Sequence, residues 1–198
     1  MKKKIELLEN VCDDTFNRFV VKLLRDQRGW RICPDDWDVK IESDMQNSAY
    51  AKSLGGHSDT GLLLHTFNDA PHEEDVSHEY ESLNTLAQYI FESVLNKSKY
   101  VYHDIELVRI LWNYYNRAST GIYHVDKDFT DKKYFSVIYH LSTCDGGTVI
   151  QKHPMIPSVS GNAIIFPSNL PHRGVGPTRE PTRYALNFLL HYSKRSLK

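Results

Sequence analysis

The stretch GNAIIFPSNLPH, residues 161–172, contains a turn, a short apolar run and a histidine in immediate succession. Gly161-Asn162 is typical of a hairpin-like turn, and the four apolar residues Ala163–Phe166 favour a β-strand. His172 follows the loop Pro167–Pro171. The stretch therefore predicts a histidine placed just beyond the end of a strand.

Similar short runs recur on both sides of this stretch. They are rich in β-branched and aromatic residues and are separated by glycine and proline turns, one of them at Gly146-Gly147. The predicted strands are Ile105–Tyr115, Tyr134–Leu141, Thr148–Gln151, Ala163–Phe166 and Arg183–His191. A series of short strands over about 90 residues is typical of a jelly-roll sandwich or barrel. We therefore expect a mainly β fold over residues 101–198.

The first hundred residues show a different pattern. Apolar residues at helical spacing after Asp13 predict a helix over residues 14–27, and a second apolar face between Leu83 and Leu95 predicts another. Leu62–Phe67 is compatible with a strand. No repeat, low-complexity tract or linker separates this half from the rest. We expect one domain over residues 1–198, in which residues 1–100 supply helices and irregular segments that support the β core.

Composition excludes several classes of protein. A net charge of −1 does not favour nucleic-acid binding, and no apolar run approaches the roughly 20 residues that a membrane span requires. The basic start is followed by acids, so no signal peptide is expected. Three widely spaced cysteines indicate reduced thiols and no disulfide framework. We expect a soluble cytoplasmic protein; the sequence does not determine its oligomeric state.

Three residues could together bind a metal. His124 and Asp126 lie two positions apart, so in an extended chain both side chains point to the same face. With His172 they provide the two imidazoles and one carboxylate that hold non-haem Fe(II) and leave adjacent positions open. Arg183, eleven residues after His172, can bind a carboxylate through its two-pronged guanidinium. A His-x-Asp pair alone is weak evidence, because such pairs arise often by chance.

The order of these segments resembles the iron(II)- and 2-oxoglutarate-dependent dioxygenases, and in particular the prolyl 4-hydroxylase-like branch. The resemblance covers residues 105–192 and extends over four segments, which are Tyr115–Asp126, Ser136–Ser142 with Gly146–Thr148, Gly161–Phe166 and His172–Phe188. It implies a double-stranded β-helix, also called a cupin-like jelly roll. It also implies oxidative decarboxylation of 2-oxoglutarate to succinate and CO2 with hydroxylation of a C–H bond by O2. Ascorbate is a further candidate cofactor.

The resemblance also implies roles for single residues. His124, Asp126 and His172 would bind Fe(II), and Arg183 would bind the distal carboxylate of 2-oxoglutarate. Tyr115 and His140 would contact the same co-substrate, although His140 stands where the family often has tyrosine. For both residues, packing in the β core is the alternative.

The resemblance leaves the substrate open. A prolyl or other residue of a protein or peptide is the first expectation, although many prolyl hydroxylases have lysine where Arg183 stands. A free amino acid or another small molecule is the alternative within the class, and a catalytically silent jelly-roll binding protein is the alternative outside it. Nucleic-acid demethylases of the family usually carry a second arginine six residues after the first, where this chain has Leu189. We expect a mobile lid over the site, formed by residues 45–75 or by residues 125–133.

Overall fold

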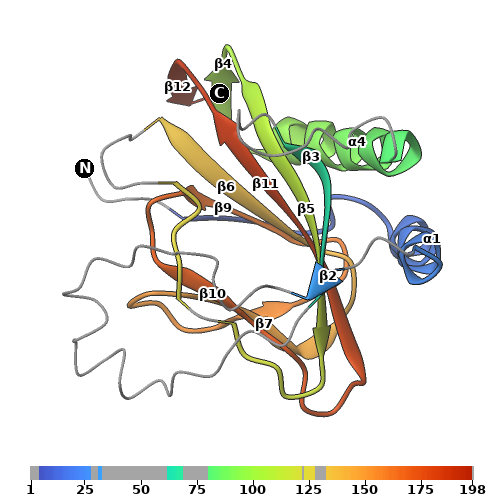
Figure 1. Ribbon diagram of the computed structural model, residues 1–198. Helices are drawn as coiled ribbons and strands as arrows, with labels where there is room; N and C mark the ends of the chain where they lie inside the picture. Colours follow the sequence, from blue (N-terminus) through green and yellow to red (C-terminus); the bar gives the residue numbers. More distant parts are fainter. Residues whose placement is uncertain are drawn as a thin grey trace.

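The computed structural model of the chain describes residues 5–27, 31–32, 62–68, 80–121, 123–127 and 133–197. In these ranges the strands form a seven-stranded, a three-stranded and a two-stranded sheet, and every pairing is antiparallel. The elements follow the division expected from the sequence, with helices before residue 100 and strands dominating after it (Figure 1). The expected mainly β fold is confirmed.

The large sheet has the order β1-β9-β6-β11-β5-β3-β2. Its strands are β1 (Glu6–Leu8), β9 (Ala163–Pro167), β6 (Tyr134–His140), β11 (Thr182–His191), β5 (Glu106–Asn116), β3 (Leu62–Asn68) and β2 (Arg31–Ile32). Four of the predicted strands end within one residue of β5, β6, β9 and β11, and the strand predicted at Leu62–Phe67 is β3. These predictions succeed because β-branched and aromatic residues suit a pleated, buried surface.

The smaller sheets complete the β structure. The three-stranded sheet has the order β10-β7-β8, with β10 at His172–Val175, β7 at Cys144–Ile150 and β8 at Ile156–Ser158. The two-stranded sheet pairs β12 (Lys194–Leu197) with β4 (Tyr100–His103). Figure 1 shows β10 and β7 on one side of the large sheet and the two helices near its other side.

The helices among the described residues are α1 (Asp14–Arg25) and α4 (Glu81–Lys97). Asp13 caps α1, because its side chain accepts a hydrogen bond from the Phe16 N–H at 2.9 Å. The helix ends at Arg25, two residues before the predicted end, and Asp26 is its C-cap residue. Tyr139 on β6 donates a hydrogen bond of 2.5 Å to Asn17 of α1, which ties that helix to the large sheet.

Strand β11 separates two apolar clusters. Its residues Tyr184, Leu186, Phe188 and Leu190 pack in a cluster with buried residues of both helices, such as Val20 and Ile90. Ala185, on the opposite face, packs with Ile150 of the three-stranded sheet and with Ile138 and Ile164 of the large sheet. Alternate side chains of a strand point to opposite faces. The face that carries Arg183, Ala185 and Asn187 therefore looks into the space between the large and three-stranded sheets.

One of the predicted turns is wrong, and another is wrong in part. Gly146-Gly147 is no turn, because both glycines lie inside β7. A Cβ on Gly147 would lie 2.2 Å from the Ile156 carbonyl oxygen, so glycine here permits close approach of a neighbouring strand. Gly161 does form a turn, with a φ of 85°. The turn is not a hairpin, since it connects β8 of one sheet to β9 of another.

Other predictions lie outside the described residues or are not tested. The two predicted lid segments fall mostly there, so the lid stays a prediction, as does the single-domain organisation. Among the described helices, neither is long and apolar enough to cross a membrane.

Candidate metal centre and carboxylate pocket

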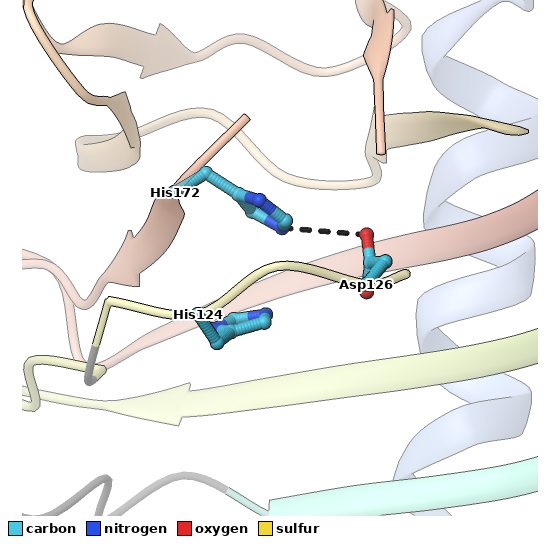
Figure 2. A group of neighbouring side chains, drawn as sticks. All are labelled: His124, Asp126 and His172. Carbon is cyan, nitrogen blue, oxygen red and sulfur yellow. Dashed lines mark ion pairs between the residues drawn. The ribbon is translucent and has the colours of Figure 1, made fainter. Parts of the chain in front are cut away.

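His124 and His172 lie on two segments that pair through their backbones. The His124 N–H donates to the His172 carbonyl at 3.0 Å, and the His172 N–H donates back to His124 at 2.9 Å. The two imidazole centroids are 4.5 Å apart. Asp126 is fixed next to them, because its own N–H donates to the Ser168 carbonyl at 3.1 Å. Figure 2 shows the three side chains gathered around one point, as the spacing of His124 and Asp126 predicted.

The donor atoms of these three residues have the geometry of a metal site. They all lie within 4.8 Å of one another. His172 Nε2 is 3.4 Å from Asp126 Oδ2 (Figure 2). The other ring nitrogen, Nδ1, is 3.0 Å from the Leu170 carbonyl, so we assign the proton to Nδ1. Nε2 then points a lone pair inward, and no described residue gives it a hydrogen bond. Two imidazoles and one carboxylate fit Fe(II) with positions left open.

Three strands of the large sheet supply donors to the Asp126 carboxylate, which is almost fully buried. Arg109 of β5 pairs with Oδ1, and Ser136 of β6 donates to Oδ2 at 2.5 Å. Asn187 of β11 donates to Oδ1 at 3.3 Å. Burial alone would raise the pKa of this carboxyl. The Arg109 charge, the two histidines and the Ser136 hydroxyl outweigh it, so the pKa lies well below its ordinary value. The carboxylate is thus ionised and oriented.

Burial also determines the protonation of His172. Its removal from water is the largest effect on its pKa and lowers it to about 4, with a further lowering from His124. The ring is therefore neutral near pH 7. A neutral imidazole is the form that binds a metal ion.

A second group of polar side chains lies on the same inner face, around Arg183. This arginine is 1% exposed. Its Nη2 donates to Thr148 Oγ1 of β7 at 3.0 Å, and its Nη1 donates to the Val175 carbonyl at 3.4 Å. The Thr148 hydroxyl accepts this bond and keeps its own hydrogen for another acceptor. Arginine and hydroxyl groups are suited to bind a carboxylate.

His140 extends the donors of this pocket. Its Nδ1 lies 3.5 Å from Arg183 Nη2 and 3.3 Å from Ser158 Oγ. Because a guanidinium can only donate, we assign Nδ1 as the acceptor and Nε2 as the protonated nitrogen. Burial, followed by the Arg183 charge, holds the pKa of His140 well below its ordinary value. The neutral ring thus carries a buried Nε2–H, for which no described residue is an acceptor.

Tyr115 supports Arg183 from the neighbouring strand. The two residues are partners in the β5–β11 register, and the guanidinium carbon lies 4.7 Å from the centre of the Tyr115 ring. Gly174 lies against the tyrosine on β10, where a Cβ would be only 2.2 Å from its hydroxyl oxygen. The tyrosine is therefore confined between β10 and the arginine.

All six residues predicted from the sequence lie on this inner face, in two groups: His124, Asp126 and His172 in the first, and Arg183, His140 and Tyr115 in the second. Four polar neighbours were missed: Arg109, Ser136, Thr148 and Asn187. The sequence does contain a sign of Arg109, Ser136 and Asn187. Each is a polar residue in an apolar strand and lies an even number of positions from Tyr115, His140 or Arg183, so it points to the same face. Thr148 had none, because it follows glycines that were read as a turn.

Comparisons with known proteins agree with this arrangement at the level of the fold. A scan of protein-family models and a search of curated proteins found no match. Solved structures do match. A 2OG-Fe(II) oxygenase family protein from Burkholderia pseudomallei matches with a TM-score of 0.61 and 14% identity, over 94% of this chain and 84% of that one.

Two prolyl hydroxylases also match. The viral collagen prolyl hydroxylase of Paramecium bursaria Chlorella virus-1, in its 2-oxoglutarate complex, has a TM-score of 0.58 and 14% identity over 97% of this chain and 98% of that one. The prolyl hydroxylase from Trichoplax adhaerens was solved in complex with a hypoxia inducible factor peptide fragment. It has a TM-score of 0.57 and 12% identity, over 96% of this chain and 84% of that one. The chain therefore has the fold of the 2-oxoglutarate oxygenases and of their prolyl hydroxylase branch, which confirms the expected jelly roll.

Proposed function

We propose that the chain is an Fe(II)- and 2-oxoglutarate-dependent dioxygenase that hydroxylates a C–H bond of a prolyl or other residue in a protein or peptide. The observation that carries this proposal is the placement of two polar groups on one inner face. One is a cluster of two imidazoles and an ionised carboxylate, with donor atoms within 4.8 Å. The other is a buried arginine with neighbouring hydroxyl and imidazole donors.

The two groups of residues would have different roles in this reaction. His124, Asp126 and His172 would hold Fe(II), which when bound supplies the oxidation of 2-oxoglutarate and of the substrate by O2. Arg183 and Thr148 would bind the distal carboxylate of 2-oxoglutarate. The His140 Nε2–H would donate to the same carboxylate. Tyr115 would hold the guanidinium in place by stacking beneath it. Burial of these groups keeps water away from them and strengthens their contacts with the co-substrate.

A peptide substrate is supported by two structural neighbours, one named as a collagen prolyl hydroxylase and one solved with a peptide fragment. The alternatives are a hydroxylase of a free amino acid or other small molecule, and a binding protein that does not catalyse turnover. They differ in what they consume and release, so one set of assays separates them.

The assay measures succinate release from 2-oxoglutarate with Fe(II), O2 and ascorbate, in the presence of proline-rich peptides or free amino acids. Mass spectrometry then tests which of these molecules gains an oxygen atom. We expect release by the wild-type protein, and a loss of at least about 100-fold in the His124→Ala variant, which lacks one metal ligand. His103→Ala is the matched control, since His103 lies on β4 in the two-stranded sheet.

The outcomes discriminate among the three functions. Oxygen gain by peptides supports the proposal, and oxygen gain by free amino acids alone replaces it with the small-molecule function. Binding of 2-oxoglutarate to the Mn(II)-loaded protein without succinate release would indicate a binding module. Equal release by the His124→Ala and His103→Ala variants would contradict the assigned metal centre.

A further inference from the structure

Arg109 is a charged, half-buried residue of β5, directly before the buried run that begins at Ile110. It pairs in register with Leu189 of β11 and with Asn68 of β3. The β5–β11 register shifts directly beside it, between Leu189 and Leu190, and the β3–β5 register shifts between His65 and Phe67. Such irregularities re-aim side chains and occur often next to active sites. The local strand geometry is therefore adjusted at the position of Arg109.

The two carboxylate oxygens of Asp126 have different partners, and Arg109 contacts one of them. Its Nη2 pairs with Oδ1 alone, whereas the Asn187 amide donates to Oδ1 at 3.3 Å and to Oδ2 at 3.5 Å. Oδ2 lies 3.4 Å from His172 Nε2 and accepts from Ser136. The guanidinium thus holds Oδ1, and Oδ2 is the oxygen that faces the imidazole.

A purely stabilising role does not account for this pair well. The Asp126 side chain is 1% exposed and the Arg109 side chain 14%, so both charges are largely removed from water. Replacement of a buried ion pair by apolar residues of similar volume is often neutral or favourable for stability. Orientation of a functional carboxylate is the role that such a pair performs and an apolar pair cannot.

We propose that Arg109 is a positioning residue that holds Oδ1 of Asp126, so that the carboxylate offers a metal ion one oxygen, Oδ2. The inference rests on the proposed function. It gives a role to Arg109, which is not one of the six site residues predicted from the sequence. A carboxylate that presents one oxygen occupies one position at the metal, whereas a carboxylate free to rotate can occupy two. Arg109 thereby keeps a position open for the co-substrate.

The test uses Co(II), whose visible absorption reports the coordination number of the bound ion. Wild type is compared with Arg109→Met, which removes the charge and the fork, and with Arg109→Lys, which keeps the charge. Arg18→Met is the matched control, because Arg18 also pairs with an aspartate but on the exposed surface of α1. Circular dichroism monitors folding of every variant, and titrations give the affinities for Co(II) and then for 2-oxoglutarate.

We expect Co(II) to bind about 10- to 100-fold more weakly to Arg109→Met than to wild type, as is typical when a partner of a metal ligand is lost. Its spectrum should change, and Arg109→Lys should fall between the two. Arg18→Met should match wild type. If Arg109→Met fails to fold, Arg109→Lys alone decides the question, because it keeps the charge and lacks the fork.

Two results would overturn the inference. One is that folded Arg109 variants bind Co(II) with the same affinity and the same spectrum as wild type. If only the melting temperature falls in these variants, Arg109 has a structural role and the inference is equally refuted. The other is failure of the wild-type protein to bind Co(II), which refutes the metal centre itself and the role of Arg109 with it. Unchanged Arg109 variants alongside a metal-binding wild type leave the proposed function intact, so the two failures are distinguishable.

Discussion

Substitution of Gly174 by alanine should disturb the carboxylate pocket through Tyr115. A Cβ at this position would lie 2.2 Å from the Tyr115 hydroxyl oxygen and 2.4 Å from the ring carbon that bears it. The glycine φ lies outside the left-handed region, so alanine fits the backbone of β10 and the effect is one of space alone. The ring has to withdraw by about 1 Å to restore an ordinary contact of 3.4 Å.

The loss of stability and of 2-oxoglutarate affinity depends on where the Tyr115 ring can move. Arg183 lies on the Tyr115 ring, 4.7 Å from its centre, and is itself fully buried. Overpacking of this kind costs about 1–3 kcal/mol of unfolding free energy. Displacement of a cation that stacks on an aromatic ring costs about 1 kcal/mol more in its interactions. We therefore expect 2-oxoglutarate to bind about fivefold more weakly to the Mn(II)-loaded Gly174→Ala protein.

The assays are urea unfolding followed by circular dichroism, and calorimetric titration of 2-oxoglutarate. Tyr115→Ala supplies the internal control, because removal of the ring also removes the overlap. The Gly174→Ala substitution should cost stability in the wild-type background and little in the Tyr115→Ala background. Residues in contact show such coupling, with a magnitude of about 1–3 kcal/mol. An equal cost in both backgrounds would refute the steric argument, as would unchanged 2-oxoglutarate affinity in the single variant.

Two further predictions concern stability. The pKa of His172 is about 4 in the folded protein, against an ordinary value of 6.5. Between these two pH values the unfolded chain binds more protons than the folded one. The metal-free protein should therefore be most stable above pH 6.5 and lose stability as the pH falls toward 4. Urea midpoints across this range test this, and a flat profile or one unaffected by His172→Gln would contradict it. Tyr139→Phe should cost about 1–3 kcal/mol, because it leaves the buried Asn17 oxygen without its 2.5 Å donor. The exposed Tyr89 provides a control, since Tyr89→Phe should leave the urea midpoint unchanged; equal midpoints for the two variants would count against this argument.

The sequence predicted the strands that carry most of the site. The runs that became β5, β6, β9 and β11 are dense in β-branched and aromatic residues, whose preference for a buried pleated surface is local and visible in one dimension. It also predicted that His124 and Asp126 share a face, because the two-residue period of an extended chain does not depend on its neighbours. Glycine was harder to interpret, since Gly146-Gly147 serves strand contact and not a turn.

Only the tertiary structure decided which other polar residues join the site. Asp126 receives Arg109, Ser136 and Asn187 from three adjacent strands, across separations of 17, 10 and 61 residues. The protonation states belong to the same level, because burial and the charge of a residue brought near by folding hold His140 and His172 neutral. Sequence alone determined the local conformation and the donor types. Antiparallel register and loss of water, which depend on the whole chain, decided which donor meets which oxygen.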